Sequence, residues 1–193
     1  MQDLRTANKR RRRQQILQAA HDLIARDGVD ALTMRSLAGS ASVSVPTVYA
    51  LVGGRDDVIA ALLDSAVHRF DAGVDTLGSR GLHRATGIVE LFADILVNER
   101  ALLYALFASG ALVSAGAGAP LLFHRRQVEL ERAYREAVED GELRADVDPT
   151  YAATTAVRLA MGIIIDWVAG ADGSADLRSE LLRASSVVIA AFA

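Results

Sequence analysis

The long stretches between the few prolines constrain the fold of this chain most strongly. Its 193 residues contain three prolines, Pro46, Pro120 and Pro149, and apolar residues recur between them at helical spacing. Residues at i, i+3, i+4 and i+7 share one face of an α-helix, whereas a half-buried strand needs strict alternation. The stretch closest to a strand pattern, residues 43–52, includes Pro46, which cannot donate to a ladder. The sequence therefore predicts an all-α protein.

Caps and stop signals predict where the helices begin and end. Thr33 and Ser44 are typical N-cap residues, and Gly28 and Gly141 are typical stops after a helix. The apolar face of the first helix consists of Ile16, Leu17, Ala20, Leu23 and Ile24. We expect helices over residues 10–27, 34–40, 45–52, 56–77, 82–98, 100–110, 120–140, 148–169 and 175–192.

The charge of the chain is distributed unevenly. The net charge is −3, but residues 1–55 contain nine Lys or Arg and four Asp residues, which gives +5. Residues 56–193 contain 12 basic and 20 acidic residues, which gives −8. A basic N-terminal part followed by an acidic remainder indicates that the first part meets a polyanion and the second does not. We therefore expect two domains, over residues 1–55 and 56–193.

The first three predicted helices have the order of a helix-turn-helix unit. A long helix is followed by a short helix, a turn near Ala41, Ser42 and Val43, and a second short helix. Five consecutive basic residues, at positions 9–13, form an arm just upstream. An arm of this kind contacts phosphates or the minor groove and adds affinity rather than sequence preference. The pattern is typical of DNA binding.

Three segments carry a resemblance to a known family. They are TMRSLA at residues 33–38, VSVPTVY at 43–49 and RDDVI at 55–59. Together they resemble the DNA-binding domain of the tetracycline-repressor (TetR/AcrR) family, over about residues 16–63. The resemblance implies an N-terminal three-helix helix-turn-helix DNA-binding domain and a C-terminal helical domain for effector binding and dimerisation. Ser42 departs from the family pattern, because it stands where glycine is usual.

The resemblance also implies roles for individual residues. Arg35 is expected to read a base edge, and Val45, Pro46 and Thr47 to face thymine methyl groups. Tyr49 resembles the family's phosphate-binding tyrosine. The full set of predicted DNA contacts is Lys9, Arg10, Arg11, Arg12, Arg13, Thr33, Arg35, Ser44, Val45, Pro46, Thr47, Tyr49 and Arg55. Several of these have structural alternatives: Thr33 as a helix cap, Tyr49 as a packing residue, and the basic arm as a solvated helix end.

Signals for catalysis, metal binding and export are missing from the sequence. The chain has no Cys, which excludes disulfides and thiolate chemistry, and its four His residues have no ligand spacing. Gly116 and Gly118 form a GxG that follows no strand and precedes Pro120, so we interpret it as a linker. No apolar run of membrane-spanning length and no signal peptide is apparent. We expect a cytoplasmic protein that is not an enzyme and has no cofactor or metal.

The last two predicted helices are rich in apolar and small residues. Both look too apolar to leave an outer face in water, which favours a four-helix bundle across a two-fold axis. The alternative is burial within one subunit. The expected dimer contacts are Ala156, Ala160, Ile163, Trp167, Leu177, Leu181, Ser185 and Val188.

Aromatic and isolated polar residues on the C-terminal helices form a candidate ligand site. Such sites are mostly apolar with a few placed polar groups, although many of these residues would serve equally well in the core. The candidates are Phe70, Phe92, Tyr104, Phe107, Phe123, His124, Gln127, Met161 and Asp166.

The sequence as a whole predicts a DNA-binding transcriptional regulator. We expect a repressor that binds a palindromic operator as a homodimer and is released by a small, mostly hydrophobic effector. The alternative is a helical ligand-carrier or interaction protein with a vestigial helix-turn-helix, which the +5 charge of residues 1–55 disfavours.

Overall fold

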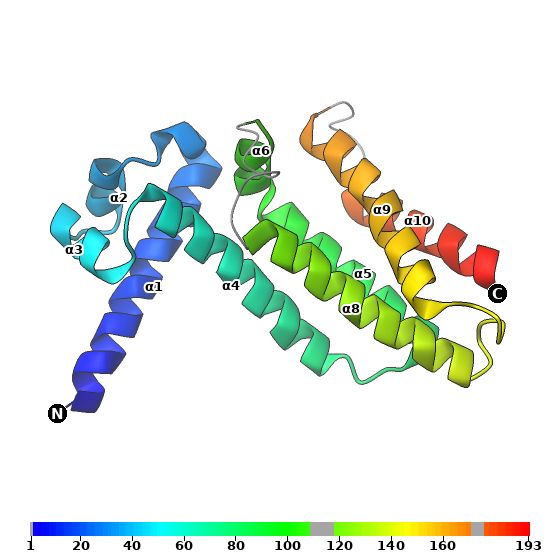
Figure 1. The fold of residues 1–193 in the computed structure, drawn as a ribbon. Helices are drawn as coiled ribbons and strands as arrows, with labels where there is room; N and C mark the ends of the chain where they lie inside the picture. Colours follow the sequence, from blue (N-terminus) through cyan, green and yellow to red (C-terminus); the bar gives the residue numbers. More distant parts are fainter. Residues whose placement is uncertain (1, 109–117, 171–175) are drawn as a thin grey trace. The chain divides into compact units, whose positions relative to one another are not determined.

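The computed structural model describes residues 2–108, 118–170 and 176–193, and side chains over residues 5–104, 123–170 and 176–193 (Figure 1). The described residues form helices and no strand, which confirms the all-α class. The chain divides into two compact units. The N-terminal unit comprises Met1–Ser65 and Arg100–Gly118, and the C-terminal unit comprises Ala66–Glu99 and Ala119–Ala193.

The N-terminal unit is organised around one long helix. Its elements are α1 (Gln2–Asp27), the short 3-10 helix η1 (Val29–Ala31), α2 (Met34–Ser40), α3 (Val45–Leu51), the first half of α4 (Arg55–Thr76) and α6 (Arg100–Ala108). The predicted apolar face of α1 is buried and packs on η1, α2, α3 and α6. The expected start near residue 10 is wrong, because α1 begins at Gln2 and residues 9–13 are helical rather than an extended arm.

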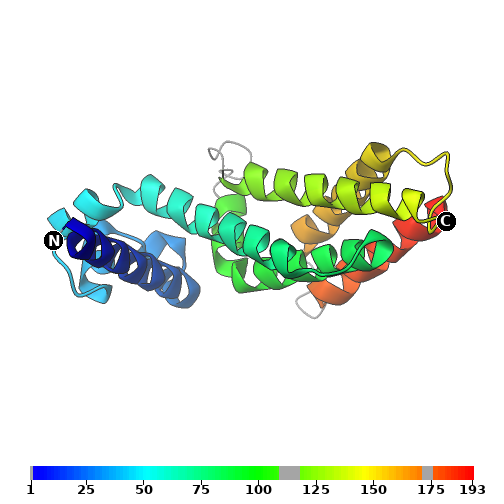
Figure 2. The same cartoon turned by 90° about the horizontal axis from the view of Figure 1, so that it is seen from below.

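The C-terminal unit contains the second half of α4 and four further helices. They are α5 (Gly81–Asn98), α8 (Gly118–Glu139), α9 (Pro149–Val168) and α10 (Leu177–Phe192). Helix α10 packs on α9 and on α5, and α5 runs alongside α8 (Figures 1 and 2). A half-buried ion pair at 3.2 Å between Arg84 on α5 and Glu129 on α8 joins these two helices.

Helix α9 differs from the expectation that the chain has no apolar run of membrane-spanning length. An 18-residue window within its 20 residues has a mean hydropathy of 1.3, so by length and composition the helix is apolar enough to cross a membrane. However, α9 packs against α10, and it carries Arg158 and Asp166. We therefore interpret α9 as a core helix of the C-terminal unit.

The turn between α2 and α3 has the geometry that normally calls for glycine. Val43 N donates to Ala38 O at 2.9 Å and Ser42 N to Gly39 O at 3.1 Å, which is the Schellman pattern at a helix C-terminus. The residue in the left-handed position is Ser42, with φ of 53°. Side chains are disfavoured there because Cβ crowds the backbone. Ser42 is therefore strained at the position where the family pattern has glycine.

Replacing Ser42 tests this strain. The variant Ser42→Gly should raise the free energy of unfolding by roughly 0.5–1 kcal/mol, since relief of the left-handed strain exceeds the entropy cost of glycine. Ser40→Gly is the matched control, because Ser40 lies in regular helix and its replacement should lower stability. Urea unfolding followed by circular dichroism measures both. Equal losses of stability in the two variants would contradict the assignment.

Candidate nucleic-acid interface

The two short helices of the helix-turn-helix unit are closed by side-chain caps. Thr33 Oγ1 accepts from Ser36 N at 3.0 Å, and Ser36 Oγ accepts from Thr33 N at 3.0 Å, which completes a capping box at α2. Ser44 Oγ accepts from Thr47 N at 3.3 Å at the start of α3. Both predicted N-caps are confirmed. The caps hold the first turns of α2 and α3 in place.

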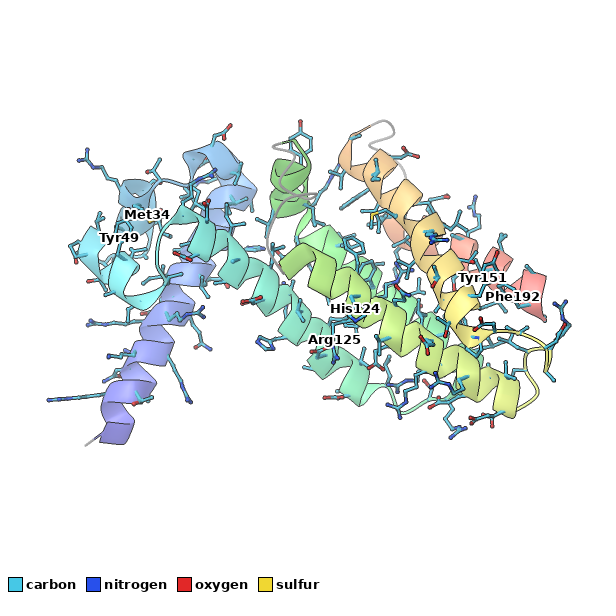
Figure 3. The ribbon with its side chains drawn as sticks, viewed as in Figure 1. Met34, Tyr49, His124, Arg125, Tyr151 and Phe192 are labelled. Carbon is cyan, nitrogen blue, oxygen red and sulfur yellow. The ribbon has the colours of Figure 1, made fainter. Side chains whose placement is uncertain are left out.

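The predicted contact residues of α2 and α3 lie mainly on the surface. Arg35 is exposed in the first turn of α2 and Pro46 is exposed at the start of α3. Tyr49 is 55% exposed, which disfavours the alternative of a packing residue; it projects from α3 in Figure 3. Val45 and Thr47 are half-buried, while Val48 is fully buried and anchors α3 to the unit. One face of α3 is therefore free to meet a partner.

A basic groove lies beside α3. It has a volume of about 670 Å³ and is formed by one face of α1 and one face of α3. The residues that line it are Arg5, Asn8, Lys9, Arg11, Arg12, Pro46, Thr47, Ala50 and Leu51. Helical spacing explains the selection, because residues 5, 8, 9 and 12 lie at i, i+3, i+4 and i+7 on α1. The structure thus brings part of the predicted basic arm next to Pro46 and Thr47.

The basic run is split by the helix that contains it. Lys9, Arg11 and Arg12 line the groove, whereas Arg10 and Arg13 are exposed and do not line it. Arg5 lines the groove as well, although the sequence did not identify it as a contact. Arg5 lies four residues before Lys9, which places both on one helix face. This could be inferred only if the helix were known to begin at Gln2.

Arg55 has a structural role that the sequence did not predict. Its Nε donates to Leu32 O at 3.1 Å and its Nη2 to Val29 O at 3.1 Å. These bonds tie the start of α4 to η1 and to the residue that precedes the N-cap of α2. The Arg55 guanidinium already donates two hydrogen bonds within the unit. Its expected contact with a DNA phosphate stays a prediction.

Three of the predicted ligand residues form one aromatic cluster in the C-terminal unit. Phe92 packs edge-to-face against Phe70 and Phe123, with ring centroids 6.2 and 5.5 Å apart, and all three are buried. Gln127 Nε2 donates to Thr154 Oγ1 at 3.1 Å, which links α8 to α9. The structure thus places the apolar part of the predicted set together.

The other predicted ligand residues whose side chains are described are not buried in this cluster. Tyr104 is 55% exposed, His124 and Asp166 are exposed, and Met161 is half-buried. His124 projects from α8 in Figure 3. The side chain of Phe107 lies outside the described residues. Tyr104, His124 and Asp166 therefore lie at the surface of the described part of the chain, and their contact with a ligand stays a prediction.

Most of the predicted dimer contacts are used inside the protomer. Seven of the eight are buried within one chain, and Ile163 is half-buried. Their apolar character therefore follows from packing of α10 on α9 and α5, which is the alternative that the sequence left open. The large apolar residues that α9 and α10 do expose are Tyr151, Leu159, Ile165 and Val187.

Comparisons with known proteins agree with this geometry. Residues 16–62 match the family model for bacterial regulatory proteins of the tetR family. No curated protein sequence matches the chain. A structure from a Rhodococcus species, described as a TetR-family transcriptional regulator, is 26% identical with a TM-score of 0.72, covering 92% of this chain and 98% of that one.

Two further structures show the same fold. SmeT, the repressor of the SmeDEF multidrug efflux pump of Stenotrophomonas maltophilia, is 20% identical with a TM-score of 0.72, covering 93% of this chain and 89% of its own. The fatty acid degradation regulator FadR of Bacillus halodurans is 18% identical with a TM-score of 0.73, covering 92% and 94%. Residues 16–62 therefore form a tetR-family helix-turn-helix DNA-binding domain, and the chain has the fold of TetR-family transcriptional regulators.

The split of the basic run gives a direct test of the groove. Replacing Lys9 and Arg12 together by alanine should weaken binding to a random-sequence duplex more than replacing Arg10 and Arg13, although both pairs remove two charges. The slope of log K against log salt should fall by about 0.9 for each phosphate contact that is lost. Fluorescence anisotropy at several salt concentrations measures both quantities. Equal effects of the two pairs would show that the run acts only as diffuse charge.

Proposed function

We propose that this chain is a TetR-family repressor that binds a palindromic operator as a homodimer. The observation that carries the proposal is the groove in which Pro46 and Thr47 of α3 lie beside Lys9 and Arg12 of α1. Basic side chains there would hold the DNA backbone, while α2 and the start of α3 meet base edges in the major groove. DNA binding by the helix-turn-helix fits the +5 charge of residues 1–55 and the −8 charge of residues 56–193.

The contacts divide into those that position and those that specify. Arg35 would donate to a guanine, and Val45 and Pro46 would contact thymine methyl groups. Tyr49, 55% exposed on α3, would donate to a phosphate. Thr47 Oγ1 already lies 2.8 Å from Ser44 Oγ, so this pair of hydroxyls would present one shared polar edge to DNA.

Arg35 provides a test of sequence readout. Arg35→Ala should cost about 1–3 kcal/mol per half-site and relax the preference at one base position, because a bidentate guanine contact is lost. Arg26→Ala is the matched control, since Arg26 pairs with Asp27 at 2.7 Å in the last turn of α1. Titration of single-base variants of an operator selected from random sequence measures the effect. Uniform weakening on all variants would place Arg35 on the backbone instead.

A dimer would place two helix-turn-helix units on one face of the duplex. Their recognition helices need a separation of about 34–36 Å or a multiple of it. The exposed apolar residues of α9 and α10 suit an interface, and among them Tyr151 packs edge-to-face on Phe192 at 6.3 Å (Figure 3). We propose that this face, rather than the buried residues named from the sequence, meets the second copy.

Charge on this face should separate the protomers. Val187→Glu should convert a dimer into a monomer of 20.5 kDa and weaken operator binding, because a buried carboxylate without a partner is costly. Val128→Glu is the matched control, as Val128 is 41% exposed on α8. Light scattering after size-exclusion chromatography measures the mass. A wild-type monomer at micromolar concentration would rule out the proposed dimer.

Release from DNA would be the task of the C-terminal unit. A small, mostly apolar effector bound there releases the operator only if it has different affinities for the DNA-bound and free conformations. The aromatic cluster of Phe70, Phe92 and Phe123 is the apolar candidate for its contacts. We also propose that the boundary between the two domains lies after residue 55. The protein would act in the cytoplasm, without a membrane partner and without a cofactor.

A further inference from the structure

Arg126 on α8 is a buried charge without a partner. Its side chain is 2% exposed, and its Nε and Nη1 atoms have no hydrogen-bond partner among the described residues. The two other buried charged side chains of the described residues are paired: Arg84 with Glu129 at 3.2 Å, and Glu99 with Arg69. Buried charges are normally paired because desolvation costs several kcal/mol per ion. Arg126 is the exception.

The Arg126 guanidinium lies over an aromatic ring. The guanidinium carbon lies 4.6 Å from the centroid of the Phe92 ring, the central member of the aromatic cluster. A cation–π contact of this kind offsets part of the desolvation but accepts no hydrogen bond from the guanidinium edge. Burial lowers the pKa of Arg126 to about 10, so the group stays charged at neutral pH.

Two hydroxyl groups of the C-terminal unit are also buried. Tyr134 Oη and Ser185 Oγ are buried and, like Arg126, have no hydrogen-bond partner among the described residues. Burial raises the pKa of Tyr134, while Ser185 and the charge of Arg126 lower it. Arg126 and Tyr134 lie on α8 and Ser185 lies on α10.

We infer that Arg126 binds the carboxylate of an otherwise apolar, singly charged effector. The inference rests on the proposed effector-controlled release and specifies the chemical class of that effector. A guanidinium whose Nε and Nη1 have no acceptor among the described residues matches an anion, and its planar shape matches a carboxylate in particular. A single cation balances one negative charge, and the Phe70, Phe92 and Phe123 cluster beside it favours an apolar body.

A matched panel of ligands tests the inference on the full chain. Straight-chain carboxylates from butanoate to dodecanoate are compared with alcohols of the same chain length, and thermal unfolding is followed by circular dichroism. At least one carboxylate should raise Tm more than its alcohol, because only the carboxylate neutralises Arg126. No difference between any carboxylate and its alcohol would overturn the inference and would indicate that water fills the cluster.

Two variants separate a ligand site from a structural one. Arg126→Met should abolish the advantage of the carboxylate, weaken its binding by at least about tenfold, and leave the Tm of the unliganded protein equal or higher. Arg84→Met is the matched control and should lower Tm, because it leaves Glu129 buried without its partner. If Arg126→Met lowers Tm as much as Arg84→Met does, Arg126 is a structural cation and the inference fails.

Duplex binding distinguishes this inference from the proposed function. The same ligands are titrated into the complex of the chain with selected operator DNA, followed by fluorescence anisotropy. Release by carboxylates but not by alcohols supports both statements. Release by alcohols to the same extent overturns the carboxylate site and supports effector control. A carboxylate that raises Tm through Arg126 but leaves the complex intact supports the site and overturns its role in release.

Discussion

Burial of one face of α1 holds the DNA-binding unit together. Ile16, Leu17, Ala20, Leu23 and Ile24 are each at most 7% exposed. They pack on η1, α2, α3 and α6, and a short helix such as α2 or α3 has too few internal bonds to be stable alone. Burying these side chains contributes on the order of 1.5–3 kcal/mol for each large residue. The same helix carries basic residues on its N-terminal half, so the core and the groove are parts of one rigid element.

The DNA-binding unit was largely predictable because local signals determine it. Thr33 and Ser44 cap the helices that the sequence assigned to them, and the α1 face repeats with helical period. Even the strained turn at Ser42 was visible, since a serine stood where the Schellman geometry requires positive φ. What the sequence did not show was the second use of Arg55, because its bonds to Val29 and Leu32 span more than 20 residues.

The C-terminal unit was less predictable, because an apolar helix face does not show whether it packs within the same chain or against a second copy. Trp167 and Leu181 read equally well as interface or core, and only the packing of α10 on α9 and α5 buries them within one chain. Arg126 was overlooked beside Arg125, which pairs with Asp71 at 2.9 Å. Yet residue 126 lies three residues from Phe123 and four from Leu130, on the buried face of α8, and that position was a usable signal.

Selection of DNA from a random pool tests the central claim of homodimeric operator binding most directly. The full chain is incubated with random duplexes, and the bound fraction is sequenced after several rounds. The account predicts enrichment of an inverted repeat whose half-site centres are separated by about 10–10.5 base pairs or a multiple of this. Enrichment of a single half-site without symmetry, or no enrichment above the starting pool, would contradict it.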